Sequence, residues 1–250
     1  MAVIEYLARF GRKIAELLSI TDMFQNEETY GAFGMSIFIA IFFVFFGWII
    51  IRKARRTRKM LSNFAIKMGF YFSSKDKHLI SADFFRFPLF RRGSARGVRN
   101  VFKGQFENAD FTLFDYWYKY SDMSHNYLVT VFPIAASIPE FELRSESIVN
   151  KIAEKFGQKD IDFEVDREFS RRYLLLGTDE AAVRELFHEG CRNFFNSIDR
   201  NGIGGVEGGG HWLVFYQWNA NYMSRKSEKY IRDIRRCLDN ALKVYTTFQK

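Results

Sequence analysis

The chain has 250 residues, of which 48% are apolar, 18% aromatic and 26% charged, and its formal net charge is +8. This composition excludes a disordered or collagen-like chain, and a mean hydropathy of −0.20 excludes a transporter built from many membrane-spanning helices. Two cysteines, Cys191 and Cys237, are too few for a disulfide framework and are typical of a reducing compartment.

Residues 1–20 are predicted to form a short amphipathic helix, because apolar side chains recur at three- and four-residue steps with charged ones opposite. Gly11 weakens this pattern. A helix of this kind lies in a membrane interface or docks against a partner helix. We assign residues 1–30, with a net charge of −2, to this helix and an extracytoplasmic segment.

The strongest signal is an apolar run from Gly31 to Ile51, which has no charged residue and a single polar one, Ser36. As an α-helix this run would reach about 31 Å, close to the thickness of one hydrocarbon core. It starts too late for a signal peptide, is too long for one, and lacks a small-residue cleavage site. The sequence therefore predicts a permanent, single transmembrane helix over residues 31–52.

Directly after this run, residues 52–59 hold six basic side chains in eight positions, whereas the other 191 residues after the run supply only +4. This asymmetry predicts that the N-terminus lies outside and that the rest of the chain is cytoplasmic. The basic octapeptide either only sets this topology or also attracts anionic lipid headgroups. Its basic residues are Arg52, Lys53, Arg55, Arg56, Arg58 and Lys59, and we assign residues 53–82 to a juxtamembrane helix and linker.

Residues 83–250 are predicted to form one cytoplasmic α+β domain with an antiparallel sheet and three or more helices. A meander of three strands is expected over 98–106, 111–120 and 126–132, and Pro133 is expected to end the third strand. Further strands are expected over 141–144, 161–165, 173–176 and 212–218. Helices are expected over 145–157, 178–198 and 224–247.

Three segments resemble a family of uncharacterised bacterial proteins that carry hydrophobic helices ahead of a soluble α+β domain. They are Phe114–Tyr118 (FDYWY), Pro139–Glu146 (PEFELRSE), and Phe169-Ser170 together with Tyr173–Leu175. The resemblance covers roughly residues 85–245 and contains no catalytic motif. It implies a location in the bacterial inner membrane and carries over no activity.

Between Phe84 and Phe106 the chain has no acidic residue, and it holds six basic residues together with several phenylalanines. Such a segment forms a solvated basic face, contacts the anionic surface of a membrane, or binds nucleic acid. Because the segment follows the apolar run closely, we favour headgroups over nucleic acid. The residues expected to contact lipid headgroups or other anions are Arg91, Arg92, Arg96 and Arg99.

Two further segments have unusual compositions. Gly202–Gly210 has six glycines in nine residues but lacks the Gly-Lys-Ser/Thr ending of a P-loop. We expect a flexible connector or hairpin, or else a mobile loop that places Glu207 and His211 at the edge of a site. Carboxylates alternate with apolar residues over 160–168, a pattern that favours a half-exposed edge strand over a divalent-ion site or an acidic partner surface.

His188 and Cys191 are three residues apart and would share one helix face, but a zinc site needs three or four ligands. Neither a metal nor a cofactor is therefore expected, and nothing in the sequence activates a cysteine nucleophile.

Two functional hypotheses remain open. The favoured one is a membrane-anchored, non-enzymatic interaction or scaffold subunit that contacts anionic lipids and binds other protein subunits. The alternative is a membrane-tethered enzyme acting on a phosphate-bearing substrate, with the four arginines as anion ligands and Glu207 or His211 transferring protons. Nucleic-acid binding is disfavoured.

Overall fold

The computed structural model describes residues 27–76, 79, 82–145, 160–199, 203–219 and 227–249. The chain divides into two compact units, Met1–Arg56 and Thr57–Lys250. The amphipathic helix expected over residues 1–20 lies outside the described residues, and so does all but the first residue of the helix expected over 145–157.

Helix α2 (Glu27–Met68) begins in the first unit and ends in the second. Within the described ranges it is the one helix that is long and apolar enough to cross a membrane, and its most apolar window has a mean hydropathy of 2.2. Its apolar side chains are exposed, including Phe38 at 69% and Phe43 at 68%. Because a helix bonds its own backbone, such a segment is stable in hydrocarbon. The predicted long apolar helix ahead of a sheet domain is confirmed.

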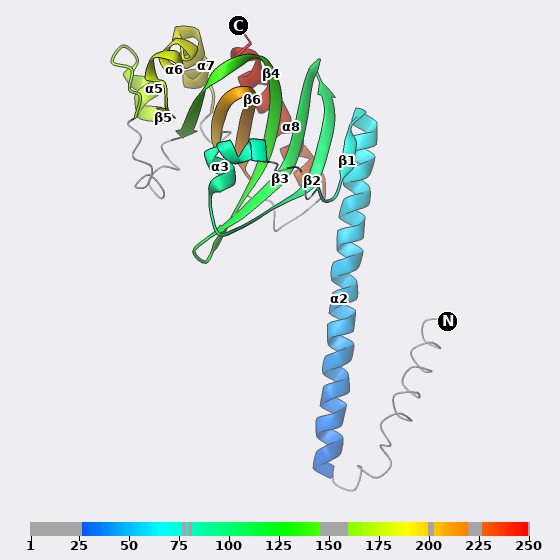
Figure 1. The fold of residues 1–250 in the computed structure, drawn as a ribbon. Coiled ribbons are helices and arrows are strands. Elements are labelled where there is room, and N and C mark those ends of the chain that lie inside the picture. The colour runs from blue at the N-terminus through cyan, green and yellow to red at the C-terminus, as the bar shows by residue number, and fades with distance from the viewer. Residues whose placement is uncertain are drawn as a thin grey trace. The chain divides into compact units, whose positions relative to one another are not determined.

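The second unit is built on a six-stranded antiparallel sheet (Figure 1). Five strands follow one another in the order β1-β2-β3-β4-β5, and β6 also pairs with β4. The strands are β1 (Tyr71–Ser73), β2 (Ala95–Phe106), β3 (Ala109–Tyr120), β4 (Met123–Ser145), β5 (Tyr173–Gly177) and β6 (Gly205–Trp218). The predicted α+β class is confirmed.

The strand pair expected over 98–106 and 111–120 is also confirmed, as the hairpin of β2 and β3. Glu107 and Asn108 form its two-residue turn, with positive φ values of 47° and 67°. Positive φ at both positions gives a turn whose twist matches that of the flanking strands, and asparagine tolerates it well.

Strand β4 continues well past Pro133, so the prediction that Pro133 ends it was wrong. The pairing of β4 with β6 shifts register between Pro133 and Ile138, and again before Phe141. A proline lacks the N–H that a regular ladder needs, and such irregular positions accommodate it. Beyond the irregularity, Phe141–Ser145 pairs with β5, so one long strand joins both parts of the sheet.

The glycine-rich segment is a strand, so the expected flexible connector or loop was wrong for residues 205–210. Strand β6 curls so far that Gly204, just before its start, donates its N–H to the carbonyl of Tyr216 near its end, at 2.8 Å. A Cβ on Gly205 would lie 2.3 Å from the Tyr216 hydroxyl oxygen, so this close approach requires glycine. The curl gives the sheet a concave face, which carries Tyr216.

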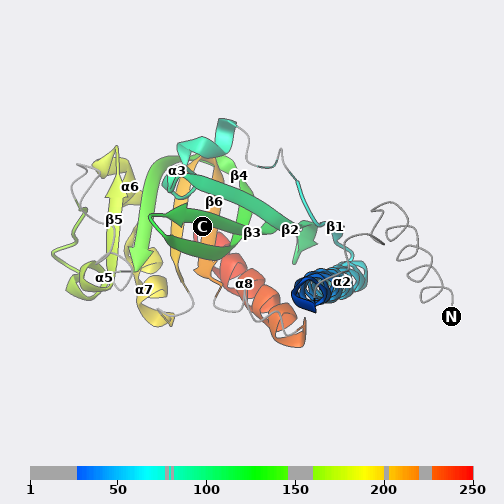
Figure 2. The same ribbon diagram turned by 90° about the horizontal axis from the view of Figure 1, so that it is seen from below.

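Helices cover both faces of the sheet (Figure 2). The concave face is covered by the short 3₁₀ helix η2 (Ala82–Arg86) and α3 (Pro88–Arg91). The other face is covered by α8 (Ser227–Thr247), whose buried residues recur at helical spacing. On that side the core includes Tyr230, Ile234, Leu238 and Ala241 from α8, and Leu61 and Phe64 from the last turns of α2.

Three short helices, α5 (Arg167–Arg172), α6 (Glu180–Leu186) and α7 (Glu189–Ser197), gather beside β5 (Figure 2). The single helix expected over 178–198 is thus two. The first, α6, begins slightly later than the expected residue 178 and is capped by Asp179, whose side chain accepts a hydrogen bond from the Ala182 N–H at 3.0 Å. The second is capped by His188, whose Nδ1 accepts from the Cys191 N–H at 3.4 Å.

The acidic stretch 160–168 is not an edge strand, which corrects that expectation. Asp160 accepts a hydrogen bond from the Leu175 N–H at 3.0 Å. Asp166 caps α5 through the Phe169 N–H at 3.0 Å and pairs with Arg192 Nε at 3.2 Å. These two carboxylates bond to backbone N–H groups and to Arg192, so they are structural although the segment is not a strand.

Candidate functional site

A network of buried charges lies on the concave face, beneath α3. Glu142 from β4 pairs with Arg92, which follows α3, and with Arg144 two positions along β4. Glu207 from β6 lies 3.6 Å from Arg92 Nη2. All four side chains are buried, and charges this deep are tolerated in a fold because they neutralise one another.

Glu207 also fixes the start of α3. Its two carboxyl oxygens accept the Leu89 N–H at 3.0 and 3.1 Å, and the Tyr216 hydroxyl donates to Oε1 at 3.2 Å. Leu89 lies in the first turn of α3, where backbone N–H groups have no partner within the helix. The carboxyl of Glu207 therefore caps a helix from a distant strand.

The two carboxyls of the network titrate in opposite directions. Burial, and after it the negative charge of Glu142, raise the pKa of Glu207 to about 8. Burial alone would also raise the pKa of Glu142, but the hydrogen bond from Arg144 and the charge of Arg92 outweigh it and lower that pKa. The pair is best described as an ionised Glu142 beside a Glu207 that holds a proton near neutral pH.

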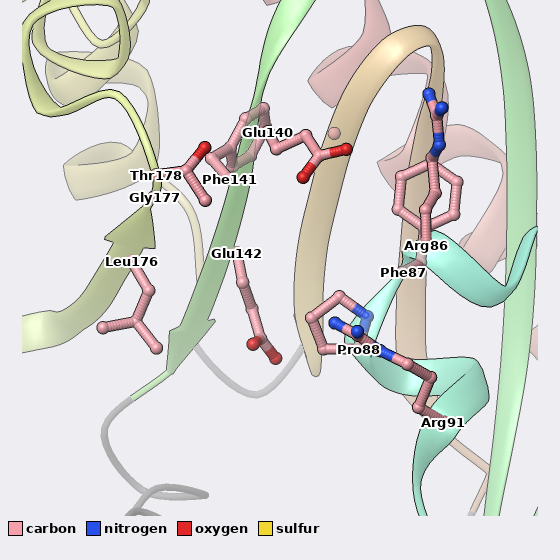
Figure 3. Close-up of a pocket in the computed structure, with 11 residues that line it drawn as sticks. Arg86, Phe87, Pro88, Arg91, Glu140, Phe141, Glu142, Leu176, Gly177 and Thr178 are labelled. Atoms are coloured by element: carbon pink, nitrogen blue, oxygen red, sulfur yellow. The ribbon is translucent and has the colours of Figure 1, made fainter. Parts of the chain in front are cut away.

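A cavity of about 240 Å³ opens beside this network, between α3 and β4 (Figure 3). Glu142 lines it, so the buried charges border this space. Arg86 and Arg91 lie on the α3 side and Glu140 on the β4 side, and all three are exposed. Apolar walls come from Phe87, Pro88, Phe141 and Leu176. The cavity therefore presents both signs of charge and suits a small polar ligand.

A second recess of about 450 Å³, which we call the β2 groove, lies at the free end of β2. It combines basic and aromatic side chains. Its lining residues are Lys75, Asp76, Phe85, Arg96, Gly97, Val98, Arg99 and Trp117. Asp76 is the one carboxylate among them, and it pairs with Lys103 at 3.3 Å. The β2 groove is therefore positively charged.

The structure separates the arginines that the sequence grouped together. Arg91 is exposed at the cavity, and Arg96 and Arg99 line the β2 groove. Arg92 is 7% exposed and points into the concave face, so the expectation that it contacts headgroups was wrong. The six basic residues of the octapeptide, Arg52, Lys53, Arg55, Arg56, Arg58 and Lys59, are exposed on α2.

Glu207 and His211, the two candidates for proton transfer, do not form a site edge together. Glu207 is fully buried in the charge network. His211 is exposed, and its Nδ1 lies 3.1 Å from the Ile134 carbonyl oxygen. Both cysteines are buried, and burial raises the pKa of Cys191 and of Cys237 to about 12, so neither thiol is activated.

Sequence reasoning missed Glu142, Arg144 and Trp117. In the sequence, Glu140, Glu142 and Arg144 alternate with apolar residues, which is typical of a strand with one solvated face. Glu207 lies opposite Glu142 in the β4–β6 pairing, and the curl of β6 brings Tyr216 to Glu207. The one available signal for this ion pair was that Glu142 and Arg144, of opposite charge, lie two positions apart on one expected strand and so share a face.

No known protein family matches the chain, and no curated protein matches it. Among solved structures, the chain is similar to the mycobacterial trehalose monomycolate transport factor A, TtfA, with 12% sequence identity and a TM-score of 0.49. The match covers 76% of this chain and 96% of that chain. A likeness of this degree identifies neither a family nor a function for the chain.

Proposed function

We propose that the protein is a single-pass subunit of a bacterial inner membrane, with its N-terminus outside and its second unit in the cytoplasm. The observation that carries this proposal is the order of features along α2. A 21-residue uncharged run ends at Ile51, six basic residues follow within 52–59, and the second unit begins at Thr57. An excess of lysine and arginine beside a span marks the cytoplasmic side.

We further propose that the second unit binds protein partners through an aromatic surface at one end of the sheet, formed by Tyr120, Met123, His125 and Trp218. Tyr120 and Met123 pair across the β3–β4 turn, and both are exposed. His125 stacks on the buried Tyr118 at 4.9 Å between ring centroids and meets Trp218 edge-on at 5.9 Å. Tyrosine, tryptophan and methionine are enriched at protein interfaces, and here a buried base holds them rigidly.

The alternative, an enzyme acting on a phosphate-bearing substrate, has weaker support. Its expected groups serve other purposes: Glu207 caps α3, and Arg92 neutralises Glu142. A catalytic acid or base must reach the proton that it transfers, and a fully buried carboxyl bonded to the backbone cannot.

The membrane topology is tested on the full chain with cysteine labelling from each side of sealed inner-membrane vesicles. A cysteine placed in the exposed turn at Ser121 should react from the cytoplasmic side only, because the two native cysteines are buried. Labelling from the outer face alone, or release of the chain by alkaline carbonate, contradicts the proposed anchoring.

The interaction surface is tested with a photo-crosslinking residue at Trp218, in the full chain and in native membranes. The matched control places the same residue at Val165, which is 87% exposed and lies outside the aromatic surface. We expect a discrete protein adduct from position 218 that the control lacks and that Met123→Ala abolishes. Adducts of equal yield from both positions would show that the surface is not specific.

A further inference from the structure

The β2 groove exists because β2 is only partly paired on its outer side. Strand β1 pairs with Val101–Lys103 and leaves the earlier residues of β2 with β3 as their partner strand. Gly97 widens this open end, because an added Cβ would lie 2.6 Å from Trp117 Nε1. The indole of Trp117 can therefore lie against the strand and form part of the groove.

Aromatic rings and backbone carbonyls hold the groove's arginines in fixed positions. The guanidinium of Arg99 lies over the Trp117 ring at 5.8 Å, and that of Arg96 lies over the Phe85 ring at 5.6 Å. Arg96 also donates to the carbonyls of Phe90 and Gly93. Cations that are already oriented lose less entropy when an anion binds. Lys75 is exposed and forms no ion pair with any described residue.

We propose that the β2 groove binds the phosphoryl headgroup of an anionic phospholipid, an inference that rests on the membrane anchoring proposed above. The groove's charge is complementary to such a headgroup, and its one carboxylate is already neutralised by Lys103. Residues 52–68 of α2 connect the apolar run to the sheet, so the proposed anchor keeps the second unit at the membrane surface, where headgroups are at a high effective concentration.

The geometry favours a phosphoryl group over a nucleic acid. Single-stranded nucleic acids bind by stacking their bases on free aromatic faces. Here guanidinium groups already cover Trp117 and Phe85, so a stacked base would have to displace Arg99 or Arg96. The rings orient cations, and the groove recognises negative charge.

The test compares the full chain in lipid nanodiscs of purely zwitterionic phosphatidylcholine with discs that contain phosphatidylglycerol. Hydrogen exchange is measured over residues 95–99 and around Trp117. We expect exchange in both segments to slow only when anionic lipid is present. We also expect about 0.5 M salt to reverse the effect, because the screening length of electrostatic attraction falls at high ionic strength. Equal exchange in both kinds of disc overturns the proposal.

The variant is the double substitution Lys75→Gln, Arg99→Gln, which leaves the structural Arg96 in place. Each basic residue near an anionic surface changes the binding constant about fivefold. The protection of the groove against hydrogen exchange should therefore fall by about that factor for each charge removed. The matched control, Lys229→Gln with Arg232→Gln, removes two exposed charges from α8 and should keep full protection. An equal loss in both variants overturns the proposal.

Two soluble probes separate the sources of phosphate in zwitterionic discs. If glycerol 3-phosphate slowed exchange with half of the effect at the same concentration as the anionic lipid, the groove would bind free phosphate esters rather than headgroups, and the proposal would be overturned. Slowed exchange with an oligonucleotide alone would also overturn it. Insertion of the chain into the discs is scored separately. A failure of the anchoring proposal is therefore distinguishable from a failure of the groove.

Discussion

Arg91 and Arg92 are neighbours in the chain, yet α3 places them in opposite environments. The last turn of the helix leaves Arg91 exposed beside the cavity, and the chain then directs Arg92 inward to Glu142. The acid-free composition around them predicts a basic surface and is correct for Arg91. It could not reveal Arg92, because its partners Glu142 and Glu207 come from β4 and β6, 50 and more residues away.

Arg92→Met should therefore destabilise the protein far more than Arg91→Met. Arg92→Met removes one of the two guanidinium groups that pair with the buried Glu142. Loss of a buried hydrogen bond to a charged group costs about 1–3 kcal/mol, whereas an exposed substitution usually changes stability by less than about 0.5 kcal/mol. Chemical denaturation of the full chain in mild detergent measures both variants. Similar unfolding midpoints for the two would contradict the buried position of Arg92.

Glu207 should make stability fall as the pH rises. Its pKa is about 8 in the folded protein and near 4.5 when unfolded, so its stabilising contribution is complete below pH 4.5 and is lost as the pH passes 8. The slope in this window is at most about 1.4 kcal/mol per pH unit. Glu207→Gln keeps an acceptor for the Leu89 N–H but cannot ionise, so its stability should be nearly independent of pH in this window.

Glu142 has the opposite sign and provides the control for this measurement. Its pKa is lowered, so its contribution is present above pH 4.5 and is lost as the pH falls through its folded pKa. The acid limb of the stability curve should therefore persist in Glu207→Gln. Unfolding free energies measured from pH 3 to 9 would refute this account if the variant retained the wild-type decrease between pH 5 and 8.

Among the secondary-structure elements, local patterns predicted the strands that have simple turns. The strands expected over 98–106 and 111–120 depend on local pattern, and both are present as parts of β2 and β3, joined by the turn at Glu107 and Asn108. Residues 205–211 of β6 and 133–140 of β4 were not predicted as strand, because glycine and proline are poor strand formers on their own. Their place in the sheet is decided by distant partners: Gly204 meets Tyr216 only after the strand curls.

The curl of β6 should tolerate alanine at Gly209 but not at Gly208. A Cβ at Gly208 would lie 2.3 Å from Phe141 Cε1 and 2.8 Å from Ile138 Cδ1, whereas at Gly209 its nearest neighbour is the flexible Glu140 side chain at 3.0 Å. Overpacking of a buried ring costs about 1–3 kcal/mol. Thermal unfolding of both variants measures the difference, and an unchanged transition in Gly208→Ala would show that β6 is less tightly packed than described.

For the whole molecule, the net charge of +8 describes two different things. Six of the basic residues belong to the octapeptide after the apolar run, and the remaining excess is spread over a unit that also buries arginines in its core. The sequence was sufficient to predict the apolar helix and to identify the basic octapeptide beside it, because length, hydropathy and flanking charge are local properties. It could not predict the β2 groove, because Lys75, Phe85, Arg99 and Trp117 meet only in the folded unit.

This division of charge predicts that position, and not net charge, decides how the chain inserts. Replacing the six basic residues of 52–59 by glutamine leaves Arg9, Arg12 and Lys13 before the apolar run and Lys67 after it as the nearest basic residues, so the excess moves to the other side. The orientation should then become mixed or inverted, since lysine and arginine near a span set its direction. Fusing a reporter that is active on one side of the membrane to the C-terminus measures the fraction in each orientation.

The matched control replaces six exposed basic residues far from the apolar run and so changes the net charge equally. Suitable positions are Lys119, Arg167, Arg171, Lys229, Arg232 and Lys243. Because these lie more than 20 residues beyond the span, the control should insert as the unmodified chain does. If both variants shifted the orientation to the same extent, the octapeptide would have no special role, and the proposed cytoplasmic location of the second unit would lose its main support.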